Sequence, residues 1–207
     1  APNGGFYSDA NRNGHGFSLE PLGIFDDNGD ELYFTIFYTY TDAGTAEWYT
    51  LLAPLVDNKI TGDMDRVSYD YNVDPTGSNT PLVFDTSIPR TLTMDFNQSA
   101  LDAGNCTTSG TTSAVASWAI GEQSGDWCVN NLDGLFGLTP TTDDIGGIWT
   151  TGNDDDGWGI SLAFTESGTI VAIMYYYDAA GNPRWVIGSD TGFDFDQDII
   201  LNMDEIA

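Results

Sequence analysis

The sequence predicts an all-β protein in which one antiparallel module occurs twice and the second copy is incomplete. Apolar and polar residues alternate along several short segments, at the period of a half-buried strand. Turn residues separate these segments, as the Asn-Gly pair at residues 28–29 does. No segment keeps the apolar spacing of a helix over a useful length. Each module is therefore expected to form an up-and-down barrel or a related sandwich, without a helix.

The duplication is carried by glycine and aromatic residues. The matched pairs are Gly14 with Gly157, Gly16 with Gly159, Leu19 with Leu162, Tyr38 with Tyr175, Tyr40 with Tyr177, Gly44 with Gly181 and Trp48 with Trp185. The offset changes from 143 to 137 residues along this series, which places the difference in length in a loop of the first copy at residues 21–31. An interval this long indicates a duplicated domain, because solenoid repeats recur every 20–50 residues or so.

The repeat divides the chain into residues 1–132, a linker at 133–146, and residues 147–207. The similarity extends to residues 200–205, which are matched with residues 60–65. The second copy therefore has counterparts of five strands but none of residues 91–97, 113–121 or 126–132. A sheet that ends early leaves an unpaired edge. The first copy, another chain or a continuation of this chain would have to cover that edge.

Individual strands follow from the alternation. The segment Leu32–Tyr40 has one wholly apolar face and one mixed face, so it is expected to be half-buried. Its counterpart Ile170–Tyr177 is apolar on both faces and is expected to be covered on both sides. Further strands are expected near Lys59–Met64 and Leu82–Phe84.

The charge of the chain excludes two classes of partner. Five Lys and Arg against 32 Asp and Glu give a net charge of −27. A field of this sign repels nucleic acid and anionic lipid surfaces. No apolar run approaches the about 20 residues of a membrane helix. The acidic residues suit either a surface adapted to salty water or calcium binding.

The two cysteines, Cys106 and Cys128, are expected to form a disulfide, which is typical of exported proteins. The first residues, Ala-Pro-Asn-Gly-Gly, are those of a chain after removal of a signal peptide, or of an artificial boundary. We therefore expect a secreted protein, extracellular or at the cell surface.

Two loops are candidate binding sites. Asp9, Asn11 and Asn13 alternate before a glycine, as oxygen ligands do at the start of a calcium loop, although the distal glutamate is missing. The corresponding loop of the second copy offers Asp154 and Asp156. The alternative is a plain polar turn. Candidate residues for ligand binding are Trp158, whose ring is exposed unless it packs on something, and Asp155 beside it.

The sequence offers no set of catalytic residues. His15 is the only histidine and is replaced by Trp158 in the second copy, so a surface loop residue is expected there. Acidic pairs for glycoside hydrolysis are too abundant in this chain to be informative. Recurrence of Trp48 and Trp185 favours a place in the core over one in ligand binding. We expect a protein that is not an enzyme.

The second copy contains a spaced set of glycine, aromatic, aspartate and proline residues, which are Gly147, Trp149, Gly157, Gly159, Tyr177, Asp178, Gly181, Pro183 and Trp185. In these residues it resembles a family of modules found in secreted proteins of proteobacteria. The first copy departs from the pattern at Ala46, where the family has proline, and by an inserted Thr41. The module is usually tandem and has mostly no assigned function, so the resemblance implies a fold and no activity. A weaker likeness, to avidin-type barrels, implies about eight strands in a meander.

These features favour a non-catalytic extracellular structural protein that works by association. Its partners would be copies of itself or another surface protein, joined by strand exchange at the open sheet edge. The alternative is a carbohydrate-binding module that uses exposed Trp and Tyr, with calcium as a candidate ion.

Overall fold

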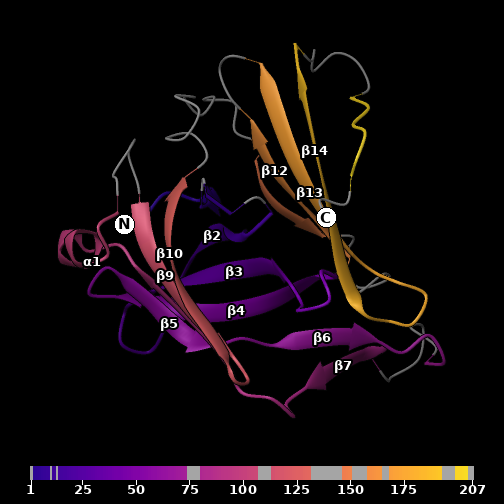
Figure 1. Ribbon diagram of the computed structural model, residues 1–207, viewed down its shortest axis with the longest axis horizontal. Helices are drawn as coiled ribbons and strands as arrows, with labels where there is room; N and C mark the ends of the chain where they lie inside the picture. The colour runs from indigo at the N-terminus through magenta and orange to yellow at the C-terminus, as the bar shows by residue number, and fades with distance from the viewer. Residues whose placement is uncertain are drawn as a thin grey trace.

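The computed structural model describes residues 2–9, 11–12, 14–73, 80–106, 113–131, 146–150, 158–164, 168–192 and 199–204. The predicted ligands Asn13, Asp154 and Asp156, the candidate Asp155, and the expected linker apart from Gly146 lie outside these residues. The described part is all-β, with a closed eight-stranded antiparallel barrel and a smaller four-stranded antiparallel sheet (Figure 1).

The barrel is an up-and-down meander with one insertion. Its strands, in order around the barrel, are β1 (Gly5–Ser8), β2 (Gly16–Phe25), β3 (Glu31–Tyr40), β4 (Ala46–Val56), β5 (Lys59–Asp63), β8 (Arg90–Asp95), β9 (Ser113–Ile120) and β10 (Gln123–Asn131). Closure is made by β10 against β1, with Asn131 opposite Tyr7. The inserted strands β6 (Arg66–Tyr69) and β7 (Leu82–Asp85) form a separate hairpin. The prediction of an up-and-down barrel is confirmed.

Aromatic rings fill the interior of the barrel. Phe37 stacks on Trp127 with ring centroids 5.2 Å apart, and Tyr7 stacks on Phe17 at 4.8 Å. These four residues are buried together with aliphatic side chains from β5 and β8. An eight-stranded barrel is just wide enough for side chains to fill it, so this interior is a core.

The second sheet repeats the first four strands of the barrel. Its strands are β11 (Gly147–Thr150), β12 (Gly159–Phe164), β13 (Thr169–Tyr177) and β14 (Pro183–Thr191). The registers agree, because Tyr175 lies opposite Trp185 as Tyr38 lies opposite Trp48. The sheet is therefore one side of a second barrel.

Residues 199–204 take the place of a fifth strand beside β14. Asp204 bridges Ile187 as Asp65 bridges Thr50, with backbone hydrogen bonds in both directions. The sequence alignment matched Asp65 with residue 205 and is wrong by one residue, because the bridges equate Asp65 with Asp204. A short apolar segment after a loop gives too few fixed positions to set the register.

The two modules pack face to face through equivalent residues. The ring of Tyr38 lies 5.4 Å from that of Trp185, and the ring of Trp48 lies 5.9 Å from that of Tyr175. Each indole N–H donates to a backbone carbonyl of the other module at 3.4 Å, Trp48 to residue 176 and Trp185 to residue 39. Reciprocal contacts of this kind define an approximate twofold axis, as in an isologous dimer.

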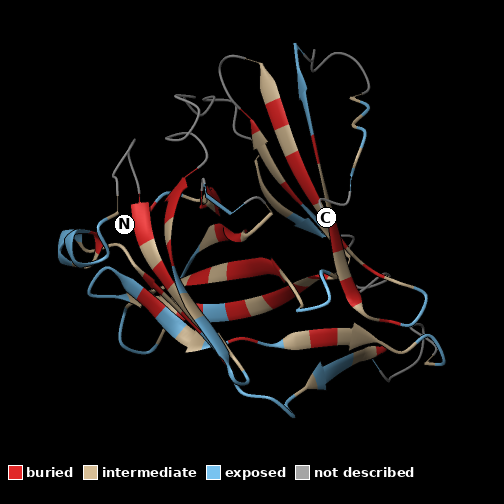
Figure 2. Cartoon of the chain, viewed as in Figure 1, coloured by how far each residue is buried: buried red, intermediate tan, exposed pale blue. Residues whose placement is uncertain are grey.

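This packing covers both faces of β3. The mixed face, with Thr35 and Phe37, lines the barrel, while the apolar face with Tyr38 meets the second module. The expectation of a half-buried strand is therefore wrong. Along β13 both faces carry buried residues, Ala172 on one and Tyr175 on the other, and no residue is exposed, as expected for a strand covered on both sides (Figure 2).

One short helix was not expected from the sequence. The helix α1 (Gln98–Ala103) has six residues, buries Leu101 and ends at Gly104. It is too short to show a helical period, so tertiary contacts decide its conformation. The predicted disulfide is confirmed, and it joins Cys106, shortly after α1, to Cys128 on β10.

The disulfide is expected to stabilise the barrel by restricting the unfolded chain. The double substitution of Cys106→Ser and Cys128→Ser should lower the free energy of unfolding by about 3 kcal/mol, given the closed loop of 22 residues. Urea unfolding followed by circular dichroism measures this loss. Reducing agent should destabilise the natural chain and leave the double variant unchanged; equal midpoints for the two chains would contradict the prediction.

The approximate twofold axis predicts equal consequences for equivalent tryptophans. Trp48→Phe and Trp185→Phe each remove one indole hydrogen bond and part of one buried ring. Each should lower the free energy of unfolding by about 1–2 kcal/mol. The control is Trp149→Phe, at an exposed position, which should change stability by less than about 0.5 kcal/mol. A loss in only one of the two interface variants would rule out equivalence.

Candidate functional site

The second sheet leaves one end of one face accessible, whereas Phe164, Ile170 and Ala172 at the other end of that face are buried. In the barrel, Tyr7, Phe17, Phe37 and Tyr49 point inward and are buried. Their counterparts, called here the open row, are Trp149, Ile160, Met174 and Val186. These four residues lie opposite one another across β11–β14 and form one row. Trp149 is 54% exposed and Ile160 is 38% exposed, so part of a face that the first module buries is accessible in the second.

Among the described residues, no strand at the edge of this sheet takes the place that β10 has in the barrel. In the first module β1 pairs with β2 on one side and with β10 on the other. Its counterpart β11 pairs with β12 only, among the residues that the structure describes. An edge strand presents unpaired backbone N–H and C=O groups, which are a template for another strand.

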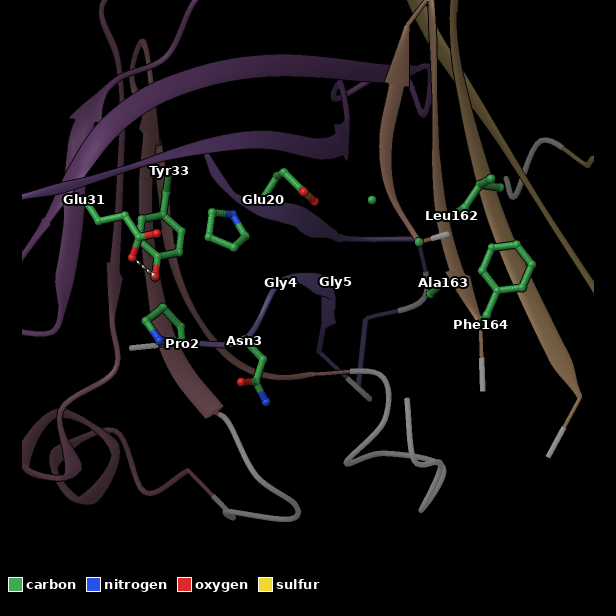
Figure 3. Close-up of a pocket in the computed structure, with 13 residues that line it drawn as sticks. Pro2, Asn3, Gly4, Gly5, Glu20, Glu31, Tyr33, Leu162, Ala163 and Phe164 are labelled. Atoms are coloured by element: carbon green, nitrogen blue, oxygen red, sulfur yellow. Dashed lines mark hydrogen bonds between the residues drawn. The ribbon is translucent and has the colours of Figure 1, made fainter. Parts of the chain in front are cut away.

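A cavity of about 570 Å³ lies beside this edge, between the two modules (Figure 3). Residues 2–5, the middle of β2 and the start of β3 form one wall, and residues 162–164 of β12 form the other. At its border Gly147 has φ +114°, and a Cβ there would lie 3.2 Å from a carboxylate oxygen of Glu20. Glycine is thus required where β11 passes the barrel.

The rim of this edge cavity is acidic. Glu20 and Glu31 both line it, and the Tyr33 hydroxyl donates to Glu31 at 3.3 Å. Burial, and secondarily the charge of Glu31, raise the pKa of Tyr33 to about 12, so its hydroxyl remains a donor at neutral pH. The chemistry of this rim favours a partner with hydrogen-bond donors or positive charge.

A second cavity, of about 320 Å³, lies on the opposite face of the sheet and is called here the inter-module cavity. The outer face of the barrel, the β6–β7 hairpin and the second sheet all contribute to it. The aromatic residues of its lining include Trp48, Phe84, Trp158, Tyr175 and Tyr177.

The structure shows the burial of three tryptophans whose surroundings the sequence did not determine. Trp158 is half-buried, lines the inter-module cavity and lies 6.3 Å from the Tyr176 ring. Trp48 and Trp185 are buried, as their recurrence suggested, although they lie between the modules and not inside the barrel. Recurrence in both copies could not distinguish these two places.

In the loop of the predicted calcium ligands, the Asp9 carboxylate contacts other groups of the protein. That carboxylate accepts hydrogen bonds from the backbone N–H of Asn11 at 2.9 Å and from its amide group at 3.3 Å. The Arg12 guanidinium lies 3.5 Å from its second oxygen. Within the described residues no group of three or more His, Cys, Asp or Glu could hold a metal. Calcium binding stays a prediction.

The single histidine packs against aromatic rings. The ring of His15 lies 5.2 Å from both Tyr40 and Trp127, so this half-buried loop residue packs on two aromatic rings. Its position is fixed by packing at the end of the barrel.

An arginine that the sequence analysis did not single out holds the wall of the inter-module cavity. Arg90 is buried and its guanidinium lies 2.6 Å from the Asp85 carboxylate at the end of β7. It also donates to the backbone carbonyls of residues 85 and 88 at 2.7 and 3.0 Å. Hydrogen bonds from Ser87, with a further contribution from Arg90, lower the pKa of Asp85 to about 2. These contacts join the β6–β7 hairpin to the barrel.

Comparisons of the chain with protein-family models, with curated proteins and with solved structures find no match. In the described part of the chain, no helix has the length and apolar character needed to cross a bilayer.

The lowered pKa of Asp85 predicts a pH-dependent stability. A carboxylate whose pKa falls from 3.8 to about 2 on folding stabilises the fold above pH 4, and this contribution is lost as the pH falls from about 4 to 2. Asp85→Asn should therefore unfold at lower urea than the natural chain at pH 7 and at the same urea at pH 2. The control is Asp27→Asn, at an exposed turn. A difference between Asp85→Asn and the natural chain that persists at pH 2 would contradict the prediction.

Proposed function

We propose that the protein is a non-catalytic extracellular association protein that receives strands of another polypeptide at the open side of its second module. The observation that carries the proposal is the open row, in which Trp149 and Ile160 remain 54% and 38% exposed where the first module has buried rings. Exposed apolar residues that form a continuous patch mark interaction surfaces. The disulfide supports a place outside the reducing cytosol.

The first module indicates how such a partner would dock. There β10 adds to the edge of β1 and turns Trp127 and Val129 into the barrel. The approximate twofold axis relates β1 to β11, so a strand beside β11 would stand where β10 stands. In the first module β1 pairs with β10 and also contacts β12. The twofold axis relates this contact to the one between β11 and β2, so a strand beside β11 would have the same space that β10 has beside β1. Strand addition supplies backbone hydrogen bonds, and alternate side chains supply specificity.

The net charge of the chain indicates which kind of partner would bind. A net charge of −27 opposes the approach of a second copy at low ionic strength. The rim acids Glu20 and Glu31 lie beside the edge where the strand would enter. The partner that fits is an extended segment of another protein with alternating apolar residues and neutral or basic residues between them. Of the two partner classes expected from the sequence, this favours another surface protein over a second copy.

Carbohydrate binding stays a prediction. The described aromatic cavity offers Thr50 and Thr150 as its aliphatic hydroxyl groups and no charged side chain, whereas sugars require several polar partners. The acids near Trp158 lie outside the described residues.

A peptide derived from the barrel tests the association. The peptide has the β10 sequence, residues 123–131, with Cys128→Ser to prevent oxidation and Asp126→Lys to suit the acidic rim. With a fluorophore at its N-terminus, it should raise fluorescence anisotropy on binding the full chain. The control peptide carries Trp127→Ser and Val129→Ser in addition, and it should bind at least about ten-fold more weakly, because it lacks the side chains that would cover the open row.

Variants of the chain locate the binding surface. Trp149→Ala should weaken the first peptide by about ten-fold, whereas Phe25→Ala, at an exposed position on β2, should leave binding unchanged. Light scattering at low and high salt measures self-association in parallel. Peptide binding that is unchanged by Trp149→Ala would overturn the proposed surface. A dimer at high salt that Trp149→Ala dissociates would replace the foreign partner by a second copy.

A further inference from the structure

The edge cavity lies at the approximate twofold axis, at a point where the two modules differ. Its lining contains equivalent residues of both modules. The equivalent pairs are Gly4 with Gly146, Gly5 with Gly147, Glu20 with Ala163, and Pro21 with Phe164. The first module thus has a carboxylate where the second has a methyl group, so the two sides of the cavity differ in chemistry.

The cavity has an acidic end and an apolar end. Glu31 and Tyr33 lie at one end, Leu162 and Phe164 lie at the other, and Glu20 lies between them (Figure 3). Among the described residues of the lining, none is basic. Lysine and arginine side chains place an apolar stem on apolar surface and keep a cationic head in polar surroundings. Such a side chain matches both ends of the cavity.

The basic side chains of the protein itself all pair with acids outside this cavity. The chain has five Lys and Arg, and the structure describes every one of them. Their ion pairs are Arg12 with Asp9, Lys59 with Asp95, Arg66 with Glu47, Arg90 with Asp85, and Arg184 with Asp178. A basic side chain that pairs with Glu20 or Glu31 therefore belongs to a partner.

The geometry of strand addition brings one partner residue to this cavity. In the first module β10 is antiparallel to β1, with Asn131 opposite Tyr7. The twofold equivalent of Tyr7 is Trp149, so a partner strand has one residue opposite Trp149 and, two residues later, one opposite Gly147. The carboxylate oxygens of Glu20 lie 3.2 and 3.3 Å from the place of a Cβ on Gly147. This second partner residue therefore lies beside Glu20.

We propose that the edge cavity recognises a lysine or arginine of the partner, placed two residues after the strand residue opposite Trp149, through an ion pair with Glu20. The inference rests on the strand addition proposed above and fixes one side chain of the partner. Glu20 is half-buried, so water still screens the pair, and its effect on affinity is modest. The ion pair selects among strands that the open row would otherwise bind alike.

Two peptides that differ in one charge test this position. Both contain residues 123–133 with the substitutions Cys128→Ser and Asp126→Lys used above, an N-terminal fluorophore and a C-terminal amide. In place of Asp133 one carries arginine and the other citrulline, which has the same shape and no charge. Fluorescence anisotropy with the full chain at low salt should show about five-fold tighter binding of the arginine peptide. At about 1 M salt the two affinities should agree within about two-fold, because the screening length is then about 3 Å.

Two variants of the chain assign the preference to one carboxylate. Glu20→Gln should bring the two affinities within about two-fold of each other at low salt. The control Asp27→Asn, which removes the same charge at an exposed turn, should keep the preference, and circular dichroism verifies that both variants fold. Equal binding of the two peptides by the natural chain would overturn this inference and leave strand addition standing. A preference that survives Glu20→Gln would also overturn it. Absence of binding by both peptides would overturn strand addition and this inference together.

Discussion

The contact between the two modules is the constraint on which the rest of the structure depends. Strands β2–β4 carry apolar residues on both faces, and a barrel can bury only the inner one. Tyr38 and Trp48 would stand exposed on the outer face of a solitary barrel. The second module covers them with its own copies, Tyr175 and Trp185. Because this surface is complementary to itself, one contact buries the outer apolar residues of both modules, as in a twofold dimer.

This arrangement explains how a four-stranded sheet can be ordered without closing into a barrel of its own. A lone four-stranded sheet has no closed core, and its stability must come from whatever its apolar faces meet. Here the face with Tyr175 and Trp185 is buried against the barrel, and the backbone carbonyls of residues 39 and 176 satisfy the indole groups. The residues that stabilise the sheet therefore lie on the face that corresponds to the outer face of the barrel in the first module. The part of the inner face around Trp149 and Ile160 therefore remains accessible in the folded sheet.

The fold class, the duplication, the disulfide and the order of most strands could be predicted, because period, turn residues and recurrence are local or self-comparing signals. Which face of each strand turns toward the interior of the barrel could not be predicted. Alternation in β3 separates Thr35 and Phe37 from Tyr38, but both sets are buried, and only the closure of β1 on β10 decides which set turns inward. The same limit applies to Arg90. Its contacts depend on the β6–β7 hairpin folding back on the barrel, which no local pattern encodes.

The second sheet gives its two faces different chemistry on one backbone. Along β13, Met174 belongs to the open row, whereas Tyr175 and Tyr177 turn toward the barrel and the inter-module cavity. Successive strand residues point to opposite sides, so a substitution on one face leaves the other face chemically unchanged. A partner on the open face can affect the packing of the sheet on the barrel only if the sheet has two arrangements that the partner distinguishes. The reciprocal tryptophan contacts oppose such a shift, because moving one module against the other breaks both indole hydrogen bonds together.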